Sequence, residues 1–248
     1  DDGNNEYGTA VVGTVSGTSI SFGTPVVYES ATTSYTSATY DSSNGKVVIA
    51  YRDHGNSQRG TSIVGTVSGT SISFGTAVVI DSTPGVSYIS ATYDSTNNKV
   101  VIAYRDEDNS NYGRAVVGTV SGTSISFGSP VTFASADTRN ISCTYDGSDK
   151  VIIAYRDQPN SNYGTVILGT VSGTSISFGS EVVFNAGTTT QIASTYDSTN
   201  DNPVIAFSDD SNSSHGTAVV LSHKSTNLTA ENYIGIAAEA ISNGATGK

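Results

Sequence analysis

Four short apolar runs, separated by polar turns, form a pattern that recurs along the chain with a period of about 52 residues. In the second copy the runs are Ser87–Tyr93, Lys99–Asp106, Arg114–Val120 and Ser124–Phe133. The second run is almost continuously apolar, which predicts a strand buried on both faces. The fourth run begins with serine alternating with Ile or Phe, which predicts a strand with one exposed face. We therefore expect four strands in each period and name them A to D in chain order.

Two nearly invariant strings mark this period. The string GTVSGTSISFG occurs four times, and its copies start at Gly13, Gly65, Gly118 and Gly169. A second string reads TYDSTNNKVVIAYRD in its second copy, and its four copies start at Thr39, Thr92, Thr144 and Thr195. Near-identical strings at a regular spacing indicate tandem structural repeats.

The fold class follows from the repeat and from its local chemistry. Strand A carries small side chains, such as Ser90, Ala91 and Thr92, which suit a crowded inner strand near a central axis. The Asn44–Gly45 pair and the repeated Ser–Gly pairs favour tight hairpins, because glycine adopts positive φ at little cost. A four-stranded meander repeated at this length is typical of a propeller blade. The prediction is an all-β protein, a β-propeller of four-stranded antiparallel blades with about four blades in this chain.

The phase of the repeat at the chain ends bears on ring closure. Residues 1–8 match residues 53–60 of a B–C loop, so the chain carries strands C and D, three complete A–D sets, and then A, B and C ending near Leu221. One expectation is that strands from both termini mix in one blade and close a ring. The alternatives are that the chain forms part of a larger ring, or that its open strand edges lead to self-association.

The repeats also set the expected domain limits. We expect one propeller domain over residues 1–224, with copies near 8–59, 60–112, 113–163 and 164–215 and a partial copy at 216–224. Residues 225–248 are expected to be an extension that starts a following module. The chain has no Met and begins in mid-pattern, so we expect it to be a piece of a longer protein.

The two strings resemble those of tandem repeat proteins from marine phage and bacterial genomes, often found beside tail-fibre modules. The stretch STNLTAENYIGIAAEAISNGATGK, residues 225–248, resembles the start of a module that follows such repeats in phage structural proteins. The resemblance covers essentially the whole chain. It implies an architecture and a location on a virion or on an extracellular or cell surface, and it implies no chemistry.

Charge and cysteine content narrow the classes of partner. The chain has 22 acidic and 11 basic residues, a formal net charge of −11, which disfavours nucleic acid and anionic membrane surfaces as partners. No apolar run approaches the roughly 18 residues that span a bilayer, so membrane insertion is not expected. Cys143 is the single cysteine, which excludes an intrachain disulfide.

Comparison of the copies with one another predicts where a ligand would bind. The A–B turns and the Ser–Gly turns barely change, whereas the B–C loops and the D–A connections differ from copy to copy. In a propeller these two sets emerge on one face, and loops on a rigid scaffold commonly carry recognition. The alternative is that exposed loops vary because nothing constrains them. The candidate ligand contacts are Tyr35, Tyr88, Arg139 and Gln191 from the D–A connections, with His54, Arg59, Glu107, Tyr112, Gln158, Tyr163 and His215 from the B–C loops.

Aspartates after strand B are weak candidates for a metal site. They are Asp53, Asp106, Asp157 and Asp209, each followed three residues later by Asn. Their oxygens could serve Ca²⁺, but no copy has the spacing of a calcium loop. We favour the interpretation that these side chains cap backbone N–H groups of their own loops, and we expect no cofactor.

Repeated Arg and Tyr residues have mainly structural interpretations. Arg52, Arg105 and Arg156 end strand B, and we favour ties to carboxylates or carbonyls of neighbouring blades over a ring of cations facing a ligand. Aromatic residues that recur at one position in every copy are expected in the core. They are Tyr40, Tyr93, Tyr145 and Tyr196, and Tyr51, Tyr104, Tyr155 and Phe207.

These observations favour a non-enzymatic recognition or structural module of a phage tail fibre or surface protein. It would act as a lectin-like adhesin, binding a cell-surface glycan or protein through the varied loops. The first alternative is a purely structural repeat spacer. The second is a glycan-cleaving propeller enzyme that uses carboxylates such as Asp106, Glu107 or Asp209, which would have to converge at about 5–10 Å.

Overall fold

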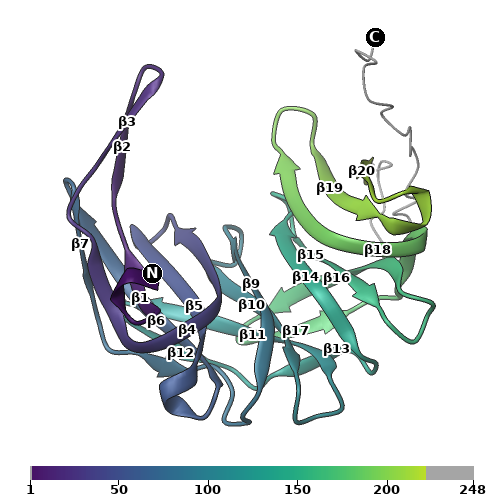
Figure 1. The fold of residues 1–248 in the computed structure, drawn as a ribbon, viewed down its shortest axis with the longest axis horizontal. Helices are drawn as coiled ribbons and strands as arrows, with labels where there is room; N and C mark the ends of the chain where they lie inside the picture. Colours follow the sequence, from purple (N-terminus) through teal and green to yellow (C-terminus); the bar gives the residue numbers. More distant parts are fainter. Residues whose placement is uncertain (1, 222–248) are drawn as a thin grey trace.

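The computed structural model describes residues 2–221, which form an all-β protein of twenty antiparallel strands and three one-turn 3₁₀ helices (Figure 1). The 3₁₀ helices are η1 (Asp2–Asn4), η2 (His54–Asn56) and η3 (Asp210–Asn212). No helix in this part of the chain has the length and hydrophobicity needed to cross a bilayer. The expected extension at residues 225–248, and residues 222–224 of the partial copy, lie outside the described residues.

Three repeat units contain all four predicted strand positions, A to D. The first unit has the end of β4 (Val26–Asp41) at position A, and the third has the start of β18 (Val182–Asp197) at position D. The remaining strands of the first unit are β5 (Lys46–Asp53), β6 (Arg59–Ser68), β7 (Ser71–Phe74) and β8 (Val78–Val79). Those of the second are β9 (Val86–Asp94), β10 (Lys99–Asp106), β11 (Tyr112–Ser121), β12 (Ser124–Phe127) and β13 (Val131–Ala134). Those of the third are β14 (Thr138–Tyr145), β15 (Lys150–Asp157), β16 (Tyr163–Ser172) and β17 (Ser175–Phe178).

The chain ends form two incomplete units. The N-terminal half-unit consists of β1 (Tyr7–Ala10), β2 (Gly13–Ser16), β3 (Ser19–Phe22) and the start of β4, which occupy positions C and D. The C-terminal unit consists of the end of β18 with β19 (Asn202–Asp209) and β20 (His215–Val220), at positions A, B and C. Because β4 and β18 each run from position D of one unit into position A of the next, they join neighbouring units into continuous sheets. The sheet orders are β1-β4-β5-β6-β7 with β8 beside β6, β12-β11-β10-β9 with β13 beside β11, β14-β15-β16-β18-β19-β20 with β17 beside β16, and β2-β3.

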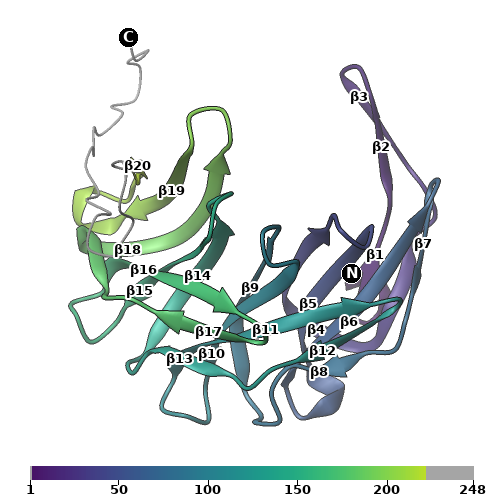
Figure 2. The same ribbon diagram turned by 180° about the vertical axis from the view of Figure 1, so that it is seen from behind.

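The units follow one another in an arc, with their A strands side by side on its inner side (Figures 1 and 2). Serine hydroxyls link these inner strands at each junction between units that carry an A strand. Ser37 Oγ accepts a hydrogen bond from Ala91 N at 3.0 Å, and Ser90 Oγ accepts one from Cys143 N at 2.9 Å. Ser142 Oγ accepts the third, from Ser194 N at 2.9 Å. The small residues predicted for strand A thus allow close approach and supply the link.

Hydrophobic clusters lie between the units. One joins Val48 and Val64 of the first unit to Ile102 and Val116 of the second, and the other junctions repeat this arrangement. Each central strand therefore packs against two neighbours. This confirms the predicted two-sided burial of strand B, since Val100 to Tyr104 are all fully buried.

The predicted burial of the repeated aromatic residues holds at one position and fails in part at the other. The first set, Tyr51, Tyr104, Tyr155 and Phe207, is at most 4% exposed. In the second set Tyr145 is 7% exposed, whereas Tyr93 and Tyr196 are partly exposed and Tyr40 is 57% exposed. The hydroxyl of Tyr145 donates to Thr96 in the A–B turn of the preceding unit. Tyr40 has no preceding A–B turn in the described chain, so the prediction of burial is wrong there.

The expected mixing of terminal strands in one blade does not occur. Strand β1 pairs with β4 and strand β20 pairs with β19, so the sheets at the two ends stay separate. Figure 1 shows the arc open between the β2–β3 hairpin and β20. A physical reason is that both ends carry a strand at position C, and one sheet has room for one such strand.

The A–B turns are held by an aspartate at their start. Asp41 Oδ1 accepts hydrogen bonds from Ser43 N and Asn44 N, and Asn44 Nδ2 donates to Asp41 Oδ2 at 2.8 Å. Burial opposes ionisation of Asp41, but the hydrogen bonds from Asn44 and Ser43 outweigh it and lower the pKa of the carboxyl. Asp94, Asp146 and Asp197 hold their turns in the same way.

This turn predicts an acid-sensitive contribution to stability. The pKa of Asp41 in the folded state lies below the value of about 3.9 for an unfolded chain, so its contribution is present above about pH 4 and is lost as the pH falls through the folded pKa. Asn44→Ala removes the Nδ2 donor and should raise the Asp41 pKa, which NMR titration of the carboxyl carbon would measure. An unchanged midpoint in Asn44→Ala would show that the Ser43 hydroxyl and the backbone donors hold the charge without Asn44 Nδ2.

Candidate functional site

The B–C loops and the D–A connections meet at the same end of the units. Val86 N in a D–A connection donates to Gln58 O in the preceding B–C loop at 3.1 Å, and Thr138 N donates to Asn111 O at 3.1 Å. Within one unit, Glu107 N donates to Gly85 O at 2.8 Å. The segments that vary between copies are therefore joined by backbone hydrogen bonds into one surface.

Aspartate side chains shape the B–C loops. Asp53 Oδ1 accepts from Asn56 N at 3.2 Å, and Asp106 Oδ1 accepts from Asn109 N at 3.2 Å. Asp209 Oδ1 accepts from Ser211 N at 3.1 Å. The capping interpretation is confirmed for these three copies, while Asp157 Oδ1 is buried without a hydrogen-bond partner. Within residues 2–221 no group of three or more His, Cys, Asp or Glu side chains is arranged to hold a metal ion.

The inner strand of each unit has an irregularity at one repeat position. Tyr35 and Tyr88 have φ of 50°, and Asn140 and Gln191 have φ of 51°. The pairing register of all four strands shifts at this point, as in a β-bulge. Left-handed φ in a residue other than glycine costs on the order of 1–3 kcal/mol, and such residues cluster at functional sites. Left-handed backbone also occurs in the B–C loops, for example at Ser57, but within strand A this position has it in every copy.

Two of these residues form an aromatic pair across a junction between units. The ring centroids of Tyr35 and Tyr88 lie 5.4 Å apart, with their planes inclined at 48°. The guanidinium of Arg52 lies 5.9 Å from the Tyr35 centroid, and that of Arg105 lies 5.7 Å from the Tyr88 centroid. These distances are within the range of cation–π attraction. Tyr35 is 41% exposed and Tyr88 is partly buried, so the pair is accessible to a ligand.

Ion pairs with carboxylates hold Arg52 and Arg105 in place next to the tyrosine rings. Arg52 pairs with Glu107 of the next unit at 3.4 Å, and Arg105 pairs at 3.3 Å with Asp137 in the connection that leads to the third unit. The predicted ties between neighbouring units are thus confirmed for these two residues. Asp137 also pairs with Arg139 at 2.9 Å. Hydrogen bonding to Asp137 raises the pKa of Arg139, so this side chain stays charged.

A cavity of about 460 Å³ opens beside Tyr35. At its wall, Ser34 Oγ and His54 Nε2 lie 2.9 Å apart in a hydrogen bond. The cavity offers a basic group, a carboxylate, several hydroxyls and an aromatic face. Its lining residues are Glu6, Thr32, Thr33, Ser34, Tyr35, Arg52 and His54.

The structure divides the candidate ligand contacts into two sets. Tyr35, Tyr88, His54, Glu107 and Arg139 lie in or next to the Tyr35–Tyr88 region through the contacts above. Gln158 joins this surface through its backbone N, which donates to Asp137 O. Gln191 has the repeat position of Tyr35 in the C-terminal unit.

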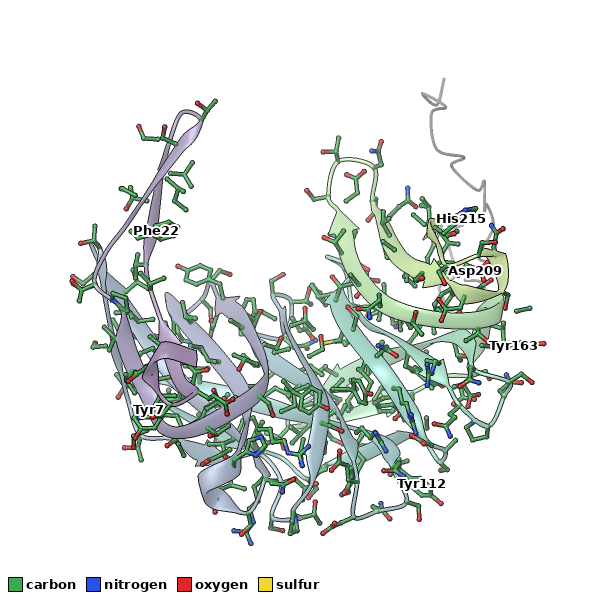
Figure 3. The ribbon with its side chains drawn as sticks, in the orientation of Figure 1. Tyr7, Phe22, Tyr112, Tyr163, Asp209 and His215 are labelled. Atoms are coloured by element: carbon green, nitrogen blue, oxygen red, sulfur yellow. The ribbon has the colours of Figure 1, made fainter. Side chains whose placement is uncertain are left out.

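The second set lies elsewhere on the loop surface. Tyr112, Tyr163 and His215 begin β11, β16 and β20, and Figure 3 shows Tyr112 and Tyr163 at the outer margin of the arc. Arg59, which begins β6, already has two hydrogen-bond partners: it donates to Asn56 Oδ1 and to Ser82 O, each at 3.1 Å.

The predicted ligand contacts do not include Asn140 or the cavity-lining residues Glu6, Thr32, Thr33 and Ser34. The residue equivalent to Tyr35 and Tyr88 is Asn140, and not its neighbour Arg139. Asn140 could have been found by counting five residues back from the repeated tyrosine near the end of strand A, which is Tyr145 in this copy. Nothing in the sequence indicates that residues 32 and 33 border a cavity with Glu6.

The groups named for catalysis have structural roles. Asp106 is fully buried and pairs with Arg114 at 2.9 Å, and Glu107 pairs with Arg52. Asp209 caps its own loop in the C-terminal unit. Burial raises the pKa of the Cys143 thiol to about 11, so this cysteine is not a thiolate at neutral pH.

No protein-family model matches the chain, and no curated protein matches it significantly.

Proposed function

We propose that this chain is a non-enzymatic recognition module with a β-propeller-type arrangement, and that it binds a cell-surface glycan through the Tyr35–Tyr88 surface. The fold part of this proposal is supported by the order of the four strand positions and by the A strands lying side by side. The resemblance of the repeated strings supports a place in a phage tail fibre or surface protein, on a virion or outside the cell. A protein ligand is the alternative partner for the same surface.

The observation that carries the proposal is the aromatic pair at positions of left-handed backbone. Tyr35 and Tyr88 present apolar ring faces with polar tips, which suits the mixed apolar and hydroxyl surface of a sugar ring. The neighbouring cavity adds Arg52, His54 and Ser34 as hydrogen-bonding groups. Both rings are held by arginines that are themselves held by carboxylates, so the surface is formed before a ligand arrives.

A glycan-array screen of the chain tests this proposal. The variants Tyr35→Ala and Tyr88→Ala should each weaken binding about tenfold or more, since loss of an aromatic contact of about 1.4 kcal/mol corresponds to a factor of ten. Alanine keeps the backbone restriction of tyrosine at positive φ, so the substitution removes the ring while leaving the backbone preference similar. Circular dichroism of each variant checks that the fold persists.

Tyr112→Ala and Tyr163→Ala are the matched controls. Both residues are loop-face tyrosines, but they lie outside the Tyr35–Tyr88 region and should leave binding unchanged. Equal loss of binding in all four variants would contradict the assignment to the inner strands.

The second candidate function is a structural spacer that stiffens or lengthens a fibre. The repeated serine links and apolar clusters at every junction favour it, because they make a rigid row of units. A folded sample that binds no glycan on the array would support the spacer over the recognition module.

A further inference from the structure

Neighbouring units pack through two different faces. The side of a unit that looks toward the C-terminus, its forward face, presents residues such as Val48, Ala50 and Val64. The side of the next unit that looks back, its backward face, covers them with Val116, Val120 and Ile125, among other residues. The junction between the second and third units repeats this contact with Val101, Ala103 and Val117 against Ile167, Val171 and Ile176.

Within residues 2–221, the backward face of the N-terminal half-unit is uncovered. Val11 is 45% exposed, Val15 is 71% exposed and Ile20 is 53% exposed. The equivalent residues of the second unit, Val116, Val120 and Ile125, are at most 7% exposed. These side chains stand on β2, β3 and the segment before them, on a hairpin that projects from one end of the arc (Figures 1 and 3).

Within residues 2–221, the forward face of the C-terminal unit is uncovered as well. Val220 is 39% exposed, whereas its equivalents Val64, Val117 and Leu168 are at most 6% exposed. Ala206 is exposed, whereas Ala50, Ala103 and Ala154 are fully buried. The two ends therefore present the two halves of the contact that the first unit makes with the second and the second makes with the third.

We propose that the chain associates with a second copy of itself head to tail, with the forward face of the C-terminal unit of one molecule covering the β2–β3 hairpin of the next. This contact is independent of the proposed glycan site. It joins two different surfaces, and such a heterologous contact continues from molecule to molecule unless the geometry closes a ring.

Two observations favour this contact between copies. The two faces lie on either side of the opening of the arc and do not meet within one molecule (Figure 2). The C-terminal unit has Ala193 in place of the linking serine found at Ser37, Ser90 and Ser142, and this agrees with a neighbour that has no A strand, as the N-terminal half-unit has none. β20 has an apolar residue, Val220, at the repeat position that makes the contact elsewhere, so we assign the contact to β20 and the hairpin. Strand pairs of the same kind, β6 with β12 and β11 with β17, touch at internal junctions.

Two variants that each block one end test this proposal. Ile20→Glu places a charge on the hairpin face, and Val220→Glu places one on the forward face. Analytical ultracentrifugation of the wild-type chain over a range of concentrations should show dimers and larger species. Each variant alone should be monomeric, and an equimolar mixture should give dimers and nothing larger, because one intact end of each kind remains.

Several results would overturn the proposal. They are a wild-type chain that stays monomeric at all concentrations, variants that associate as the wild type does, and a mixture that stays monomeric. Val183→Glu is the matched control, since Val183 is 43% exposed at position D of the third unit, which carries neither terminal face, and its variant should associate normally. Thermal unfolding of each variant monitors the fold. Association should also strengthen with salt, because copies of net charge −11 repel each other and screening reduces that repulsion.

Discussion

Replacing Tyr155 with alanine is expected to lower the free energy of unfolding by about 3–5 kcal/mol, the usual cost of truncating a buried aromatic side chain. Tyr155 is fully buried in the cluster between the second and third units. Its ring packs against Phe133 with centroids 5.4 Å apart, and its hydroxyl donates to Glu181 at 2.6 Å. Alanine would leave a cavity at the middle of the arc. The midpoint of urea unfolding measures the effect.

Tyr155→Phe is the matched control, because the chain itself has Phe207 at this repeat position. It keeps the ring and removes only the hydrogen bond to the Glu181 carboxylate, and a hydrogen bond to a charged group contributes about 1.5–3 kcal/mol. Glu181 is exposed and can be hydrated once the hydroxyl is gone, so the cost should lie at the low end of that range. Equal losses for alanine and phenylalanine would mean that the hydroxyl contact, and not packing between units, stabilises this junction.

The sequence predicted the features of this fold that depend on local chemistry. The apolar run from Val100 to Tyr104 predicted a strand buried on both faces, because continuous apolar residues are stable only when covered on both sides. The Ser–Gly turns have the expected positive φ, for example 61° at Gly122. The class, all-β with four strand positions per repeat, followed from the same periodicity.

Features that depend on neighbouring units were not predictable from one repeat. Tyr40 and Tyr145 occupy the same repeat position, yet their exposures differ by fifty percentage points because only Tyr145 has a preceding turn to cover it. The bulge at Tyr35 and Tyr88 leaves no mark in the hydrophobic pattern, because a shift of pairing register is a relation between two strands. The separation of the terminal strands likewise depends on a competition for position C that the repeat count does not resolve.

Replacing Asp106 with alanine is expected to lower the free energy of unfolding by about 3 kcal/mol, the low end of the usual cost of removing one partner of a buried ion pair, because Arg114 keeps its second carboxylate partner, Asp81. The Asp106 side chain is fully buried and accepts a hydrogen bond from Arg114 Nη1 at 2.9 Å. Arg114 also contacts Asp81 at 3.0 Å, and Asp81 accepts from the Tyr104 hydroxyl at 2.7 Å. The loss would therefore disturb a network that spans the first and second units.

Asp209→Ala is the matched control, since Asp209 has the same repeat position but only caps its loop. Its loss should cost about 1 kcal/mol, the usual value for removing a cap. Urea unfolding of both variants gives the comparison, and equal effects would show that the pair with Arg114 adds nothing to the cap. The same experiment separates structure from catalysis. A catalytic carboxylate of a glycan-cleaving enzyme would abolish turnover when removed and leave stability nearly unchanged, whereas the contacts of Asp106 require the loss to appear in the free energy of unfolding.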